Sequence, residues 1–420
     1  LIIVEKGRED EVKRIFDKWD LPWAEIGNVT NTGQMVVKNN DEVVADLPAA
    51  KLADEAPIYH REAKEPAYLD EVHSFTLEGI EDFDDPGRAL EKLLEWPSIA
   101  SKNWVYRQYD HMVRANTMVN PGSDAAVIRI KADSVPGGDE EREFPEKLIA
   151  LSVDCNATHV YLDAYEGSKA AVAECARNLA CSGATPIGTT DNLNFGNPHN
   201  PELFWQLKES VRGLAEGCLV FDAPVTGGNV SLYNESRGTG IYPTPVVGAL
   251  GLLPDVSKRV DIGFRDASDI VVLIGRDSLA SGAEELAGSE YLENIHGLVA
   301  GRPTIDLDLE TAVQRACRRL VSEGALHSAH DCSDGGLLVA IAESCIGGDI
   351  GFHGSFELPD RWVAALFGEA QSRIIVVVPE HRMIELKTLC AHEDVAWMRL
   401  GTTGGTRLRF GALLDVGIDE

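Results

Sequence analysis

Apolar and polar residues follow two different spacings along most of this chain. Short apolar runs bounded by turn residues are typical of strands, and apolar residues three and four positions apart are typical of amphipathic helices. We expect strands at residues 127–130, 149–153, 159–162 and 270–274. We expect helices at residues 168–181, 201–217, 312–321 and 336–345. Strands that alternate with helices predict an α/β or α+β fold.

The two ends of the chain share one sequence pattern. At a constant offset of 374 positions, residues 1–27 align with residues 375–401, and Trp23 coincides with Trp397. Each segment reads as an apolar strand, a charged turn, an amphipathic helix and a second strand that ends at glycine. Because tryptophan is rare, we interpret the match as a tandem duplication whose first copy lacks its front, which makes the chain the back half of something larger. The alternative is two unrelated segments with the same order of elements.

Changes in composition divide the chain into four segments. Residues 59–100 are rich in glutamate, proline and aspartate, and we expect a linker with short helices there. This linker separates the incomplete first copy, residues 1–58, from the long stretch of strands and helices that follows. That stretch divides again near residue 245, which gives two domains at residues 101–245 and 246–420.

Charge narrows the choice of partners. The 420 residues include 38 basic and 68 acidic residues, so the formal net charge is −30. Phosphate backbones and anionic lipids repel such a chain, and we expect neither a nucleic-acid partner nor a membrane partner. A phosphorylated ligand would need a divalent cation or a cluster of backbone N–H groups to offset the charge.

Cysteine usage and hydropathy indicate the compartment. None of the 8 cysteines belongs to a C-x-x-C pair, so we expect buried, reduced thiols rather than zinc ligands or disulfides. No apolar run approaches the ~18 residues that span a bilayer, and the N-terminus does not read as a signal peptide. We therefore expect a cytoplasmic protein.

Two polar segments are candidates for ligand binding. Asp191 and Asn192 follow a predicted strand and precede a helix that begins near residue 201, where outward-pointing N–H groups suit an ion or a polar ligand. Asn229 and Ser231 follow a glycine pair that ends at Gly228. Paired glycines let a ligand approach the backbone, and a carboxamide oxygen suits a hard cation. Ordinary turns, or a β-bulge at the glycines, explain the same residues.

Three further polar residues stand beside predicted strands. Asp154 ends one strand, Asn156 follows it, and Asp124 comes just before another strand. An aspartate at such a position can hold Mg²⁺, although a capping or turn role explains it as well. P-loop and Rossmann motifs are absent from the sequence, and no histidine pairs convincingly with a nucleophile. Nucleophilic catalysis is therefore not indicated.

Several motifs resemble one enzyme family. The run LSVDCNATHVYLDAYEGSKAAVAECARNLACSGATPIGTTDNLNFGNP and the later GGNVSLYNE resemble the synthetase component of phosphoribosylformylglycinamidine synthase, the PurL type. YDHMVRANTMVNPGSDAAVIRI and HDCSDGGLLVAIAESC fit the same family, so the resemblance covers essentially the whole chain. Ala164 is a departure, because the family usually has proline at that place.

The resemblance implies both a fold and an activity. The family belongs to the aminoimidazole ribonucleotide synthetase-like superfamily, which uses ATP without a P-loop. Its members combine an N-domain, which forms a shared β-barrel, with an α/β C-domain, and in this family the pair is tandemly duplicated. Residues 1–58 would then be the remnant of a first C-domain, followed by a second N-domain and a second C-domain. The reaction converts formylglycinamide ribonucleotide, glutamine-derived ammonia and ATP to the amidine, ADP and phosphate.

The resemblance also implies roles for individual residues. By motif, Asp191 and Gly228 would contact ATP, Asn229 would bind Mg²⁺, and Ser231 would contact the ribonucleotide. The family's catalytic histidines lie in the first N-domain, so we expect no catalytic residue here and no turnover by this chain alone. Expected partners are the missing N-terminal half, a glutaminase subunit and a small bridging subunit.

Some alternatives stay open. Asp154 and Asn156 occupy the places of a Glu and a His in the family's first N-domain, so they resemble a changed copy of that site. Another member of the superfamily, of the selenophosphate or thiamine-phosphate kinase type, is a competing enzyme. A nucleotide-binding half that only stabilises the assembly is the alternative that is not an enzyme.

Overall fold

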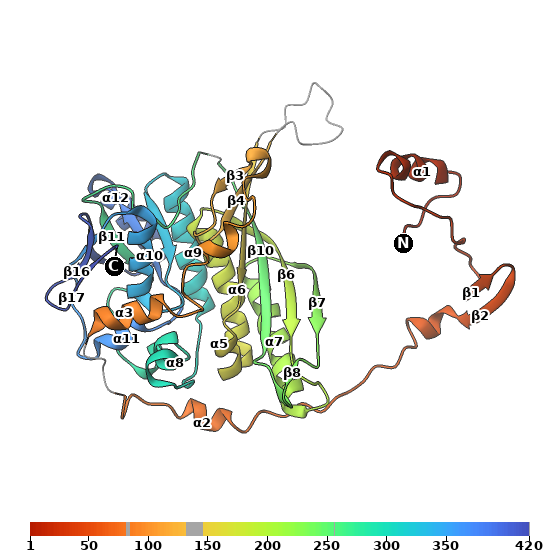
Figure 1. The fold of residues 1–420 in the computed structure, drawn as a ribbon, viewed down its shortest axis with the longest axis horizontal. Helices are drawn as coiled ribbons and strands as arrows, with labels where there is room; N and C mark the ends of the chain where they lie inside the picture. Colours follow the sequence, from red (N-terminus) through yellow and green to blue (C-terminus); the bar gives the residue numbers. More distant parts are fainter. Residues whose placement is uncertain (81–84, 132–145, 256, 420) are drawn as a thin grey trace. The chain divides into compact units, whose positions relative to one another are not determined.

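The chain divides into two compact units, Leu1–His60 and Arg61–Glu420 (Figure 1). The computed structural model describes residues 1–80, 85–131, 146–255 and 257–419. Among these residues, no helix is both long and apolar enough to cross a membrane.

The first unit contains one helix and one β-hairpin. Helix α1 (Glu9–Lys18) confirms the helix that the first copy of the repeat predicts. Strands β1 (Gln34–Asn39) and β2 (Glu42–Pro48) pair with each other in antiparallel fashion. The two strands expected on either side of α1 were wrong, because the segments that flank this helix form no strand. A strand requires a neighbour that accepts its backbone hydrogen bonds, which a local sequence pattern does not provide.

The second copy of the repeat has every expected element. Strand β14 (Ile374–Val378), helix α12 (Met383–Glu393) and strand β15 (Trp397–Thr403) follow one another as predicted. Both strands pair with β11 (Ile270–Ile274), which lies between them. The same sequence pattern therefore forms both strands and the helix where a neighbouring strand supplies hydrogen-bonding partners.

Residues 117–253, called the N-domain below, contain a six-stranded sheet with the order β3-β4-β5-β10-β6-β7. Neighbouring strands are antiparallel except for the parallel pair β6 and β7. The strands are β3 (Thr117–Val119), β4 (Ala126–Ile130), β5 (Lys147–Asp154), β6 (Thr185–Asn194), β7 (Val225–Ser231) and β10 (Thr244–Leu253). A small separate hairpin consists of β8 (Glu235–Ser236) and β9 (Thr239–Gly240).

Helices cover one face of this sheet (Figure 1). Helix α6 (Ala164–Cys181) packs against β5, β6 and β10, and α7 (Pro201–Val220) packs against α6. Both helices confirm the predicted ones. The strand expected at residues 159–162 was wrong, because these residues belong to helix α5 (Ala157–Leu162). The Asn156 side chain accepts a hydrogen bond from the His159 N–H (3.0 Å) and caps this helix. Asn156, three residues before the run at residues 159–162, could have predicted the helix, because asparagine is a preferred N-cap residue.

The opposite face of the sheet exposes apolar side chains. Burial alternates along all of β10 and along β5 as far as Val153, so every second residue of each strand points away from the helices. Val153 has 72% of its surface exposed. Exposed apolar residues of this face, called the open sheet face below, are Ile130, Leu151, Val153 and Ile187. Exposed apolar side chains on one face of a sheet are typical of an interaction site.

Residues 270–417, called the C-domain below, contain a seven-stranded sheet with the order β12-β14-β11-β15-β13-β16-β17. The strands not yet given are β12 (Ser328–Asp331), β13 (Phe352–Gly354), β16 (Arg407–Phe410) and β17 (Leu414–Gly417). The helices not yet given are α8 (Glu290–His296), α9 (Leu307–Ser322), α10 (Gly336–Gly348) and α11 (Trp362–Phe367). Alternate residues of β11 join two different apolar clusters, so this sheet is buried on both faces.

The segment expected to be a linker contributes to this core. Helix α3 (Pro86–Leu94) buries Ala89, Leu90 and Leu93 in the same cluster as α10 and α11. Upstream lies α2 (Leu69–His73), and downstream lies α4 (Asn103–Tyr106). Residues 61–100 therefore belong to the second compact unit, and the first unit ends at His60.

Arg177 joins the N-domain to the C-domain. Its side chain on α6 is fully buried. The guanidinium donates to Asp331 on β12, to Glu310 on α9 (3.0 Å) and to Gln371 (3.1 Å). Three donors in a fixed fork match three acceptors from the other domain, which fixes the position of α6 against α9.

His330 forms a second link between the domains. Its Nδ1 lies 2.7 Å from an oxygen of Asp124 and its Nε2 lies 3.0 Å from an oxygen of Glu343. Asp124 also accepts a hydrogen bond from the backbone N–H of Asp331 (3.1 Å). Burial opposes the imidazolium, but the two carboxylates outweigh this effect and hold the pKa of His330 well above its usual value.

We expect the substitution Arg177→Met to destabilise the chain strongly. It leaves Glu310 and Asp331 as buried carboxylates without their cation, which costs about 3–5 kcal/mol of unfolding free energy. Urea denaturation followed by circular dichroism measures this loss. The matched control is Arg265→Met, because Arg265 is part of a surface ion pair with Asp261 and should cost about 1 kcal/mol or less. Equal losses in the two variants would contradict the role given to Arg177.

We expect the stability of the chain to fall at alkaline pH through His330. The folded state raises the pKa of this group above that of the unfolded chain, about 6.5. Its contribution is therefore complete below about pH 6.5 and is lost as the pH rises through the folded-state pKa. The variant His330→Gln should be less stable near pH 6 and should lose part of the alkaline slope. Urea unfolding from about pH 6 to about pH 10 tests this, and identical slopes in both proteins would refute it.

Candidate functional site

The parallel pair β6 and β7 brings the predicted ligand-binding residues together. Its register places Asp191 opposite Gly228, Asn192 opposite Asn229, and Asn194 opposite Ser231. The sequence predicts loops at these residues, but the structure places them inside strands. The predicted helix start is confirmed, because α7 begins at Pro201 and Asn200 caps it.

The pairing divides these residues between the two faces of the sheet. Paired residues of parallel strands point to the same side, and successive residues point to opposite sides. Asn192, Asn229 and Ser231 therefore share one side, while Asp191 and Gly228 share the other. Across the sheet, Asp154 pairs with Val247 of β10, which in turn pairs with Asp191. Asp154 and Asp191 are thus two strands apart in one row, about 10 Å.

Position 228 has room only for glycine, because Asp191 lies against its backbone. A Cβ atom at position 228 would collide with the Asp191 carboxylate and its backbone oxygen. The backbone of β7 therefore comes close to this carboxylate. Burial raises the pKa of the Asp191 carboxyl group.

Side chains on the other side of the pair remain available to a ligand. Asn229 is exposed, and within the described residues neither its side chain nor that of Asn192 makes a hydrogen bond. Ser231 is held by Asn234, whose Nδ2 donates to the Ser231 carbonyl (2.8 Å) and to its Oγ (3.1 Å). Asn234 was missed, although it lies inside the motif GGNVSLYNE.

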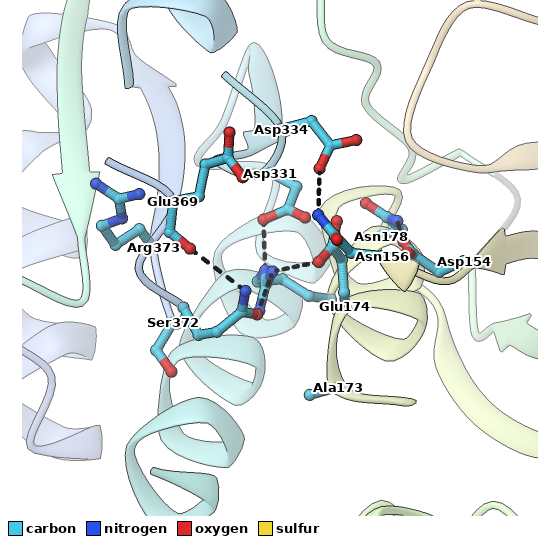
Figure 2. Close-up of polar contacts among 12 residues, drawn as sticks. Asp154, Asn156, Ala173, Glu174, Asn178, Asp331, Asp334, Glu369, Ser372 and Arg373 are labelled. Carbon is cyan, nitrogen blue, oxygen red and sulfur yellow. Dashed lines mark hydrogen bonds and ion pairs between the residues drawn. The ribbon is translucent and has the colours of Figure 1, made fainter. Parts of the chain in front are cut away.

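Asp154 and Asn156 belong to a partly buried cluster between the domains (Figure 2). Asp154 accepts a hydrogen bond from Asn178 (3.1 Å), and Asn156 donates to Asp334 (3.1 Å). Asp124 is held by His330 instead. Burial raises the pKa of Asp154, and the nearby carboxylate of Asp334 raises it further.

Two members of this cluster were missed. Glu174 and Asn178 lie four residues apart on α6, on a helix composed mostly of small residues. Burial raises the pKa of Glu174, and the neighbouring Asp154 carboxylate adds to this effect. Their spacing by four residues could have predicted that the two polar side chains lie together, because such residues share one helix face.

Two family models match this chain. The model described as AIR synthase related protein, N-terminal domain, matches residues 122–253, and the corresponding C-terminal domain model matches residues 267–411. The structure of the Thermotoga maritima protein titled "T. maritima PurL complexed with ADP" is similar in fold, with a TM-score of 0.62 at 22% identity over 96% of this chain and 55% of that one. The structure titled "T. maritima PurL complexed with FGAR" has a TM-score of 0.60 at 16% identity, over 84% of this chain and 55% of that chain.

Curated relatives are similar over the whole chain. The phosphoribosylformylglycinamidine synthase subunit PurL of Moorella thermoacetica is 44% identical over 425 aligned residues, which cover 100% of this chain and 56% of that protein. The corresponding subunit of Anaeromyxobacter sp. (strain K) is 45% identical, over 100% of this chain and 55% of that protein. The chain thus spans about half the length of these relatives. It belongs to the AIR synthase related family, and along its whole length it is similar to part of the PurL subunit of phosphoribosylformylglycinamidine synthase.

Proposed function

We propose that this chain is part of an ATP-dependent ligase of purine biosynthesis. The enzyme would convert formylglycinamide ribonucleotide and glutamine-derived ammonia to the amidine, with release of ADP and phosphate. The observation that carries this proposal is the β6–β7 pair, where the side chains of Asn192 and Asn229 make no hydrogen bond within the described residues and lie on the face of the sheet that the helices do not cover. Support comes from the relatives named PurL and from solved PurL structures titled as complexes with ATP, ADP and FGAR.

In this proposal the two sides of the strand pair have different roles. Asp191 and Gly228 contact ATP, and position 228 is glycine because a Cβ atom there would collide with the Asp191 carboxylate. On the other side, Asn229 supplies a carboxamide oxygen to Mg²⁺, with Asn192 as its register neighbour. Ser231 contacts the ribonucleotide.

The residues present fit a magnesium ion and a phosphorylated ligand. Oxygen ligands suit Mg²⁺, and the exposed Asn229 leaves its carboxamide free within the described residues. Bound Mg²⁺ would neutralise phosphate charge that a chain of net charge −30 otherwise repels. Asn234 fixes Ser231, so that its hydroxyl is oriented before the substrate arrives.

The chain supplies one wall of the proposed site. The open sheet face is apolar, and in our proposal an N-terminal half with its own N-domain covers it and contributes the catalytic histidines. A glutaminase subunit and a small bridging subunit complete the complex, which works in the cytoplasm. Asp154 and Asn156 have a structural role, because both are held by protein hydrogen bonds inside the partly buried cluster.

We expect Asn229→Ala, made in the full-length protein that contains this chain, to lower kcat/KM for amidine formation by roughly 100-fold. Asn229 is exposed, so the midpoint of thermal unfolding should change little. Steady-state assays of ADP release, paired with differential scanning calorimetry, measure both effects. The control is Asn39→Ala, an exposed asparagine of β1, which should leave turnover unchanged. Full turnover with a lowered melting temperature would instead favour a stabilising half without a catalytic role.

We expect the 420-residue chain alone to form no product from ATP, ammonia and formylglycinamide ribonucleotide, because the proposed catalytic histidines are not on it. Addition of the separately produced N-terminal half should restore product, measured by mass spectrometry. Product formation by the chain on its own would refute the one-wall arrangement.

A further inference from the structure

Three side chains of the kinds that bind metal ions meet at one edge of the C-domain sheet. Asp266 and Asp269 precede strand β11, and His327 precedes strand β12. Both strands pair with β14, which lies between them, so their first residues lie at the same edge of the sheet. One ligand atom from each of the three side chains lies within 4.8 Å of the other two. None of these residues belongs to the site proposed above.

His327 contacts both aspartates. Its Nδ1 lies 2.6 Å from Oδ2 of Asp269 and 3.3 Å from Oδ2 of Asp266. Ligand atoms that bind one ion at about 2.0–2.2 Å are themselves about 3.0–3.4 Å apart in octahedral or tetrahedral geometry. The distance to Asp266 already fits this range. The distance to Asp269 is that of a hydrogen bond, and it lengthens by less than about 1 Å when an ion replaces the proton.

The two carboxylates have no lysine or arginine partner within the described residues. The adjacent Arg265 pairs with Asp261 instead. Asp269 is buried, with 6% of its surface exposed, and its Oδ1 makes no hydrogen bond in the part of the chain that the structure describes. Even a protonated His327 leaves one negative charge in the cluster. Buried charges in proteins are paired or bind a metal ion.

Thr403 on β15 holds the two aspartates in position. Its hydroxyl accepts a hydrogen bond from the Asp269 N–H (3.0 Å) and donates one to the Asp266 carbonyl (2.6 Å). Its own N–H donates to the Asp269 carbonyl (3.0 Å). The backbone that presents both carboxylates is therefore fixed before an ion arrives. An ion can reach the cluster from solvent, because Asp266 is exposed and His327 is partly exposed.

We infer that Asp266, Asp269 and His327 form a binding site for a divalent transition-metal ion of the zinc type. An imidazole nitrogen suits Zn²⁺ and related ions, whereas Mg²⁺ and Ca²⁺ prefer oxygen ligands alone. Three protein ligands leave at least one position of the ion for water. Nε2 of His327 makes no hydrogen bond within the described residues, so it can hold the ring proton when Nδ1 binds the ion. The bound ion joins the starts of β11 and β12.

The visible absorption of Co²⁺, a coloured substitute for Zn²⁺, tests the inference on the 420-residue chain without an affinity tag. We expect one Co²⁺ per chain, with the weak bands of nitrogen and oxygen ligands and no thiolate-to-cobalt charge-transfer band. The absence of that band excludes binding by any of the 8 cysteines. Zn²⁺ should displace Co²⁺, whereas an excess of Mg²⁺ should not. Zn²⁺ should also raise the midpoint of thermal unfolding, because it binds the folded chain.

The variant His327→Gln removes the nitrogen ligand and should weaken Co²⁺ binding about tenfold or more. The matched control is His392→Gln. His392 belongs to the same domain and also lies beside a carboxylate, 3.1 Å from Glu393, but it is not part of the cluster, so this variant should bind like the parent chain. Asp266→Asn is a second ligand variant, and because Asp266 is exposed it should fold like the parent chain.

The inference fails if no Co²⁺ binds, if the thiolate band appears, or if Mg²⁺ displaces Co²⁺ as readily as Zn²⁺ does. It also fails if His327→Gln and His392→Gln bind Co²⁺ alike. Circular dichroism shows whether each variant is folded. If His327→Gln does not fold, the comparison of Asp266→Asn with the parent chain decides, and equal affinity of these two proteins overturns the inference.

Discussion

The structure depends on one buried cation, the guanidinium of Arg177. It donates to acceptors on β12, on α9 and in the segment before β14, so it joins the N-domain helix α6 to three parts of the C-domain. Carboxylates are abundant at this interface, and a chain of net charge −30 has few cations with which to balance them. Burial nevertheless raises the carboxyl pKa values of Asp154 and of Glu174, although a Glu174 oxygen lies 3.6 Å from the Arg177 guanidinium.

This interface explains why the N-domain sheet has one covered face and one open face. Helix α6 lies between the sheet and the C-domain, so it buries the inner residues of β5 and β10. The open sheet face remains apolar, and its β7 edge carries Asn229 and Ser231. A chain that presents polar ligand groups beside an uncovered apolar sheet is suited to complete a site with another domain.

Much of the fold could be predicted from the sequence. Helices α6 and α7 and strand β11 were predicted because each has a long or uninterrupted apolar pattern. Residues 159–162 were predicted wrongly because four apolar or aromatic neighbours fit either element, and only the Asn156 cap decides between them. The burial of α3 was not predictable from a Glu- and Pro-rich composition, because the elements that it packs against, α8, α10 and β17, lie far along the chain.

The candidate site was partly predictable. The motifs marked Asp191, Gly228, Asn229 and Ser231, but strand register, which is a non-local property, decides that they lie on two sides of one strand pair. Asp124 shows the limit of local inference, because its partner His330 is 206 residues away. Composition and spacing contain no information about such pairs, whereas the packing of α6 against the C-domain creates them.

Hydrogen exchange measured by mass spectrometry tests the central claim, that this chain supplies one wall of a shared ATP site. The peptides to follow cover β6 and β7, with and without the N-terminal half and with a non-hydrolysable ATP analogue and Mg²⁺. The account predicts that the analogue slows exchange at residues 225–231 only when both halves are present. Equal protection of the chain alone, or protection confined to other segments, would contradict it.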